Sequence, residues 1–114
     1  MSDVVLTKRK IKPGKTEQLK EWMAEIRRRE DEAIETYENE GMYSESAFIE
    51  RTDNGDFLVY YMESEDAHKA YDAYTDSTHE IDRKHKKVMA ETLEDERNVG
   101  EYELLYHLTA PNRP

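Results

Sequence analysis

The spacing of apolar and polar residues predicts alternating strands and helices along the whole chain. Residues 4–11, VVLTKRKI, are rich in β-branched residues and partly alternate, which is typical of a strand. Pro13 and Gly14 interrupt this pattern, and apolar residues then recur at steps of three and four as far as Gly41. This spacing predicts one long amphipathic helix. Its apolar stripe comprises Leu19, Trp22, Met23, Ile26, Ala33, Ile34 and Tyr37.

The middle of the chain predicts a β-hairpin whose second strand is apolar on both faces. Residues 42–51 form the first strand, and the turn residues 53–56 connect it to the strand 57–62. Side chains alternate between the two faces of a strand, so Phe57, Val59 and Tyr61 point one way and Leu58, Tyr60 and Met62 the other. Both faces of the sheet must therefore be covered.

The last third of the chain predicts a split helix followed by a strand. A short helix starts near Ser64 and breaks near Asp76; Ser77 and Glu80 then match a capping box for a second helical segment. Residues 102–108, YELLYHL, are apolar on both faces and predict a closing strand. The order β-α-β-β-α-β is that of the ferredoxin-like α+β fold, with an antiparallel four-stranded sheet.

These elements predict a single domain over residues 1–114, with an ordered core of about residues 3–108. The helices can cover only one face of the sheet. A soluble monomer rarely exposes an apolar patch as large as the other face. We therefore expect a homodimer in which two copies pack sheet face against sheet face.

The order of the motifs resembles the dimeric α+β barrel superfamily. The resemblance is carried by "KPGK", the helix with Trp22, the hairpin, "YYMES", the split helix and the closing "ELLYHL", over about residues 3–108. Within that superfamily, the run "STHEIDRKH" resembles an uncharacterised domain family found largely in prokaryotes. Related barrels include cofactor-free monooxygenases, haem-degrading enzymes, sugar mutarotases and proteins without known activity. The resemblance therefore implies a fold, and it carries over no catalytic residue.

Composition narrows the classes of partner. The 114 residues include no cysteine, which excludes disulfides and thiolate metal sites. The net charge of −10 would repel nucleic acids and anionic membrane surfaces, so we expect neither as a partner. The longest apolar run, residues 57–62, is too short to span a bilayer, and no signal peptide is expected. These observations predict an acidic cytoplasmic protein and leave open whether its host is halophilic.

The histidines in "DSTHEIDRKHKKVM" offer little support for a metal site. His79 and His85 are six positions apart, so they lie about 120° apart around a helix. Helical metal ligands are instead spaced three or four positions apart, on one face. Asp82 lies between them, but its simplest role is an ion pair with Lys86 at i+4. We expect no metal and no cofactor.

Several residues are candidates for a small-molecule site between the sheet and the helices. His85 lies on an apolar helical stripe and is expected to face inward, either as an acid or base or as a core residue with a satisfied hydrogen bond. We expect His85 with Tyr60 or Tyr106 at the pocket wall, and His79 near its mouth. The candidates for binding are His85, His79, Tyr60, Tyr106 and Trp22, and those for catalysis are His85, His79 and Tyr60.

Three hypotheses follow. The first is a homodimer that binds a small organic molecule between sheet and helices. The second is a cofactor-independent enzyme, either a monooxygenase or an isomerase, that uses a histidine with a tyrosine. The third is a structural or regulatory dimer without a pocket. An enclosed cavity with a histidine and a tyrosine hydroxyl would favour the second, whereas a filled core would favour the third; the sequence does not decide whether the protein is an enzyme.

Overall fold

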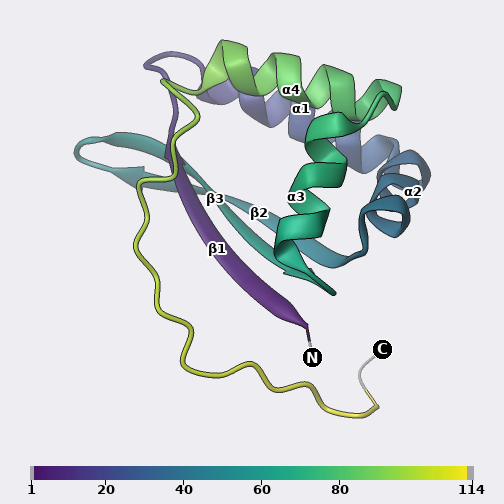
Figure 1. Cartoon of the computed structure of the whole chain (residues 1–114). Coiled ribbons are helices and arrows are strands. Elements are labelled where there is room, and N and C mark those ends of the chain that lie inside the picture. Colours follow the sequence, from purple (N-terminus) through teal and green to yellow (C-terminus); the bar gives the residue numbers. More distant parts are fainter. Residues whose placement is uncertain (1, 113–114) are drawn as a thin grey trace.

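The computed structural model describes residues 2–112 and has a mixed α+β fold. Within this range, four helices pack on an open three-stranded antiparallel sheet (Figure 1). The elements in chain order are β1 (Asp3–Lys10), α1 (Thr16–Arg28), α2 (Glu30–Glu40), β2 (Met42–Thr52), β3 (Gly55–Ser64), α3 (Ala67–Asp76) and α4 (Glu80–Thr92).

The sheet has the order β1-β3-β2, with β3 in the centre. Tyr60 of β3 is paired with Thr7 of β1 and with Ala47 of β2, and these residues therefore share one face. Leu58 and Tyr60 are buried against the helices, whereas Phe57, Val59 and Tyr61 alternate onto the opposite face. The predicted hairpin and its two apolar faces are thus present.

The hydrophobic core lies between the sheet and the helix layer, on one side of the sheet only (Figure 1). α1 and α4 pack against each other over the sheet and contribute five of the ten buried core residues. The buried core residues are Ile11, Leu19, Trp22, Ala33, Leu58, Tyr60, Ile81, Val88, Met89 and Leu93.

The long helix predicted up to Gly41 is broken at Arg29, which separates α1 from α2. Arg29 has φ −108° and ψ 39°, outside the helical region, although its N–H still donates to the carbonyls of Glu25 and Ile26. Its guanidinium forms ion pairs with Glu32 in α2 and with Glu80 at the start of α4. The break thus coincides with a contact to a distant segment, which the local pattern does not contain.

The predicted fourth strand and the ferredoxin-like order are not present in the described chain. Residues 94–99 follow the outer edge of β1, where Glu94 N–H donates to Lys10 O and Val99 N–H to Lys8 O. Beyond Gly100 the segment leaves this edge, and residues 102–108 form no strand. Leu105 and Leu108 are 84% and 82% exposed. Both sides of this segment are apolar, and a single chain has no second layer to cover them.

The sheet face away from the helices is here called the open face. Its apolar side chains are Val4, Leu6, Phe48, Phe57, Val59 and Tyr61. Phe48 is 56% exposed. Polar contacts lie beside this apolar surface: Lys8 pairs with Glu50 at 2.7 Å, and His107 of the C-terminal segment contacts Glu63 at 3.0 Å. The open face is therefore covered only in part.

Candidate functional site

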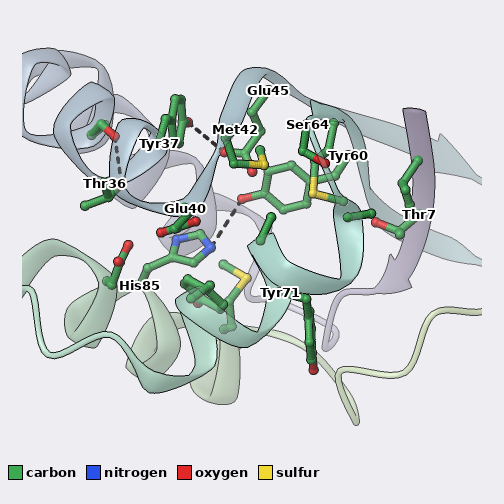
Figure 2. Close-up of a pocket in the computed structure, with 18 of the residues that line it drawn as sticks. Thr7, Thr36, Tyr37, Glu40, Met42, Glu45, Tyr60, Ser64, Tyr71 and His85 are labelled. Carbon is green, nitrogen blue, oxygen red and sulfur yellow. Dashed lines mark hydrogen bonds between the residues drawn. The ribbon is translucent and has the colours of Figure 1, made fainter. Parts of the chain in front are cut away.

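A pocket of about 570 Å³ lies between the helix-covered face of the sheet and α2, α3 and α4 (Figure 2). Most of its wall is apolar or aromatic, with a few polar groups among these side chains. The residues that define its character are Ile26, Ala33, Tyr37, Glu40, Met42, Glu45, Tyr60, Met62, Ala70, Tyr74, Asp82, His85 and Met89.

Helical spacing explains why the helices present these residues together. In α2, Ala33, Tyr37 and Glu40 are four and three positions apart, so they lie on one face. In α4, Asp82 and His85 are likewise three apart. Alanines at several wall positions leave the space that larger side chains would fill, so the pocket persists in an otherwise packed interior.

His85 takes part in a chain of hydrogen bonds that runs from the core to the pocket wall. The indole N–H of Trp22 donates to His85 Nδ1 at 2.9 Å. Nδ1 is therefore unprotonated, and in the neutral ring the proton lies on Nε2, which is 3.4 Å from the Tyr60 hydroxyl. The Tyr60 hydroxyl in turn donates to Met23 Sδ at 3.9 Å (Figure 2 shows His85 and Tyr60 facing each other).

The chemistry of His85 follows from this environment. Burial lowers its pKa from the ordinary 6.5 to about 4, against a smaller opposing effect of Asp82. The ring is thus neutral at physiological pH, and both nitrogens are engaged. This geometry favours a histidine with satisfied hydrogen bonds at the pocket wall over a general acid or base.

Three carboxyl groups meet at the end of the pocket nearest α2. Burial, followed by the nearby charge of Asp82, raises the pKa of Glu40 to about 8. Burial also raises the pKa of Glu45, although Glu45 Oε1 accepts a hydrogen bond from the Tyr37 hydroxyl at 2.7 Å. Glu40 Oε1 and Asp82 Oδ2 are buried and receive no hydrogen bond from the described residues. A protonated Glu40 can donate to Asp82; when both are ionised, neither of these oxygens has a donor.

The expected outward ion pair between Asp82 and Lys86 is wrong. Asp82 is only 7% exposed and lines the pocket. Lys86 Nζ donates instead to the carbonyl oxygens of Thr75 and Ser77, at 2.9 and 3.2 Å. The unpaired carbonyls at the end of α3 thus take the cation that the i+4 rule assigned to Asp82.

The predicted capping box at the start of α4 is also wrong, because the helix begins three residues later than Ser77. His79 is the N-cap, and its Nδ1 accepts from the Ile81 N–H at 3.3 Å. The Ser77 hydroxyl accepts from the His79 N–H at 3.2 Å. His79 lines a smaller hollow beside the main pocket, and Glu40 and Asp82 line both.

The other two candidates lie outside the pocket wall. Trp22 is 4% exposed and belongs to the core, where it contacts His85. Tyr106 is 75% exposed on the C-terminal segment. Of the five candidates, His85 and Tyr60 are thus brought together in the pocket, and His79 lies next to it.

The carboxyl residues of the pocket were missed at the sequence level. One signal was available, because Glu40 lies three positions after Tyr37 and so continues the apolar stripe of the predicted helix. Asp82 likewise lies three before His85. Within residues 2–112, no three histidine or carboxylate side chains are arranged to hold a metal ion.

Comparison with known proteins identifies a family and no activity. The model of a family of unknown function (DUF6176) matches residues 2–113. No curated protein and no solved structure matches the chain. In the part of the chain that the structure describes, no helix is long and apolar enough to cross a membrane. Inference about function therefore depends on the geometry of the pocket.

Proposed function

We propose that this chain, which belongs to the family of unknown function DUF6176, binds a small organic molecule in the pocket between the sheet and the helices. The observation that carries the proposal is the pocket itself. Its 570 Å³ lies within the roughly 300–1,000 Å³ typical of ligand sites. Such sites combine an apolar and aromatic wall with a few polar groups, as this one does.

The pocket and its histidine also bear on the two alternative functions, a dimer without a pocket and a cofactor-independent enzyme. A structural or regulatory dimer without a pocket would be expected to fill this space, because protein interiors are closely packed. A cofactor-independent monooxygenase or isomerase would need a histidine that can exchange a proton with its substrate. The two nitrogens of His85 are directed at Trp22 and Tyr60, which makes His85 unsuited to that role.

The proposed functional unit is a homodimer joined through the open face, as in the dimeric α+β barrels. The apolar side chains of that face and the exposed segment 102–108 support this proposal. The outer edge of β1 is followed by another segment only as far as Lys8. In the dimer, residues 102–108 would serve as the fourth strand and complete the ferredoxin-like order.

A fragment screen by thermal shift, followed by calorimetry on the hits, tests ligand binding. Ala67 lines the pocket on α3, whereas Ala90 is exposed on α4. Ala67→Phe should fill the pocket and weaken every hit, and Ala90→Phe should leave the affinities unchanged. If the screen yields no binder, or if Ala67→Phe binds the hits as tightly as the parent chain does, the proposal is wrong.

Light scattering after size exclusion tests the dimer. The expected mass is twice the 13.5 kDa of one chain. Tyr61→Asp on the open face should give a monomer, whereas Ile34→Asp on the 42% exposed position in α2 should remain a dimer. A parent chain that is monomeric at low and at high salt would exclude this assembly.

A further inference from the structure

The carboxylate cluster, defined as Glu40, Glu45 and Asp82, gathers three acidic groups in a pocket whose wall is mostly apolar or aromatic. The three side chains come from α2, β2 and α4 and line the same cavity (Figure 2 shows Glu40 beside His85, and Glu45 farther away, next to Tyr37). Among residues 2–112, no ion pair joins any of them to a lysine, arginine or histidine. The cluster thus has no cation of its own within ion-pair distance.

Among the described residues Asp82 has no cationic partner, and its hydrogen bond with Glu40 exists only while Glu40 is protonated. Its side chain belongs to a residue that is more than nine-tenths buried, and it faces the pocket. Its Oδ2 atom receives no hydrogen bond from the described residues, and neither does Glu40 Oε1. Buried carboxylates are normally paired or hydrogen-bonded, because an unpaired buried charge is costly.

We infer that the ligand of this pocket is an organic molecule with a protonated amine, whose ammonium group contacts Asp82 and Glu40. This inference rests on the proposed function and specifies the class of ligand. An ammonium group has three donors, and it would reach Glu40 and Asp82 through the carboxyl oxygens that face the pocket, since Glu40 Oε1 and Asp82 Oδ2 are themselves buried. The apolar part of the molecule would lie among the aromatic rings of Tyr37, Tyr60 and Tyr74. Aromatic faces also attract cations, which adds to the preference for an amine.

The cations near the pocket do not compete for this role. Lys86 Nζ is held by the carbonyls of Thr75 and Ser77 and lies 5.1 Å from the centre of the Tyr74 ring. The guanidinium of Arg9 donates to Thr7 Oγ1 and to the carbonyl oxygen of Glu96. These hydrogen bonds engage donors of both cations away from the three carboxyl groups, so an acidic group placed beside Glu40, Glu45 and Asp82 would be repelled.

Binding of an amine should release a proton. The groups that face Glu40 are Asp82 and Lys86 from α4, Glu45 from β2 and Tyr37 from its own helix. Their combined effect, with burial, keeps Glu40 protonated at neutral pH, since its pKa is about 8. An ammonium group that contacts Glu40 favours the carboxylate, so the carboxyl proton leaves for solvent as the amine enters. Affinity for an amine should accordingly rise as the pH approaches 8, the pKa of Glu40 without ligand.

The test uses probes that differ only in the charge of the terminal group. Tryptamine, indole-3-ethanol and indole-3-propionate form one set, and octylamine, octanol and nonanoate form a second set with a different apolar part. Calorimetry in two buffers of different ionisation enthalpy measures affinity and proton release together. We expect the amine of at least one set to bind about tenfold or more tightly than its alcohol, with no detectable binding of the acid.

Substitutions assign this preference to the carboxylate cluster. Asp82→Asn and Glu40→Gln should each remove the advantage of the amine over the alcohol while the alcohol binds as before. Asp72→Asn is the matched control, because Asp72 is exposed on α3 and lies outside the pocket wall. Circular dichroism shows whether each variant is folded. If Asp82→Asn does not fold, Glu40→Gln alone provides the test.

The outcomes separate this inference from the proposed function. If the alcohol or the acid binds as tightly as the amine, or if the hits of the fragment screen are neutral and acidic molecules, the inference is overturned and small-molecule binding stands. If neither probe set nor the screen gives a binder, the proposed function fails and the inference fails with it. An amine preference that survives both substitutions would also overturn the assignment to Asp82 and Glu40.

Discussion

The hydrogen bond between Trp22 and His85 makes a quantitative prediction about stability. The Trp22 side chain is 4% exposed, and its N–H donates to His85 Nδ1 at 2.9 Å. In His85→Phe this N–H is left buried without an acceptor, and the Tyr60 hydroxyl loses its contact with His85 Nε2. A buried unsatisfied donor costs about 1–3 kcal/mol, so we expect a loss of that size in the free energy of unfolding.

A double-mutant cycle with Trp22→Phe isolates the pairwise contribution. Trp22→Phe removes the donor and part of the core packing, and the double variant leaves no unsatisfied N–H or imidazole nitrogen at this place. We therefore expect the double variant to be more stable than the sum of the single losses implies, by about 1–2 kcal/mol. Urea unfolding followed by circular dichroism is the assay, since fluorescence would lose its only tryptophan. Losses that add to within about 0.5 kcal/mol would refute the hydrogen-bond assignment.

The same residue predicts a pH dependence whose sign can be stated. The pKa of His85 is about 4 in the folded chain and ordinarily 6.5, so between these values the unfolded chain binds more protons. Stability should fall as the pH drops through this window, by up to about 3 kcal/mol at its lower end. Glu40 acts in the opposite direction, because its folded pKa is raised. The informative quantity is therefore the difference in the free energy of unfolding between the parent chain and His85→Phe. If this difference does not change with pH, the environment of His85 does not lower its pKa.

Three further predictions follow from other parts of the molecule. Above pH 8 Glu40→Gln should be more stable than the parent chain, because the folded parent chain must then ionise Glu40 in its buried place. Below pH 4.5 Glu40 is protonated in both the folded and the unfolded chain, so the difference in stability should be much smaller. Thermal unfolding above pH 8 and below pH 4.5 measures this difference. Gly41 ends α2 with φ 73°, so Gly41→Ala should lose about 1 kcal/mol in urea unfolding, and a loss no larger than that of Asn39→Ala would contradict this reading. With a net charge of −10, the protein should show no binding to a random oligonucleotide at physiological salt, and salt-sensitive micromolar binding would contradict the charge argument.

Local signals in the sequence predicted the strands and the orientation of their side chains. The turn at Asn54 and Gly55 lies between two runs of strand-forming residues, and the alternation from Phe57 to Met62 assigns each side chain to a face. The break at Arg29 was not predictable in this way, because residues 16–40 contain no glycine or proline and the apolar spacing resumes at Ala33. The segment 102–108 has the composition of a strand, but pairing requires a neighbour, and composition does not specify one.

The candidate site was predictable only where local spacing along one helix determines the position of a side chain. The helical stripe of α4 places His85 inside, and the structure brings it to Tyr60. The burial of Asp82 was not predictable, because the local i+4 rule offered Lys86 as its partner. The carboxylate cluster joins residues from three elements, so it exists only after α2, β2 and α4 have packed together.

The break at Arg29 determines the reach of the helix layer. A continuous helix over residues 16–40 would be about 37 Å long, close to the 42 Å of the longest dimension of the molecule. It would carry Tyr37 and Glu40 past the sheet, and the pocket would lose a wall. The single non-helical residue instead turns α2 toward β2 and α3 (Figure 1). The direction of α2, and with it the place of Tyr37 and Glu40 at the pocket wall, is therefore set at this one joint, beside the ion pairs of Arg29 with Glu32 and Glu80.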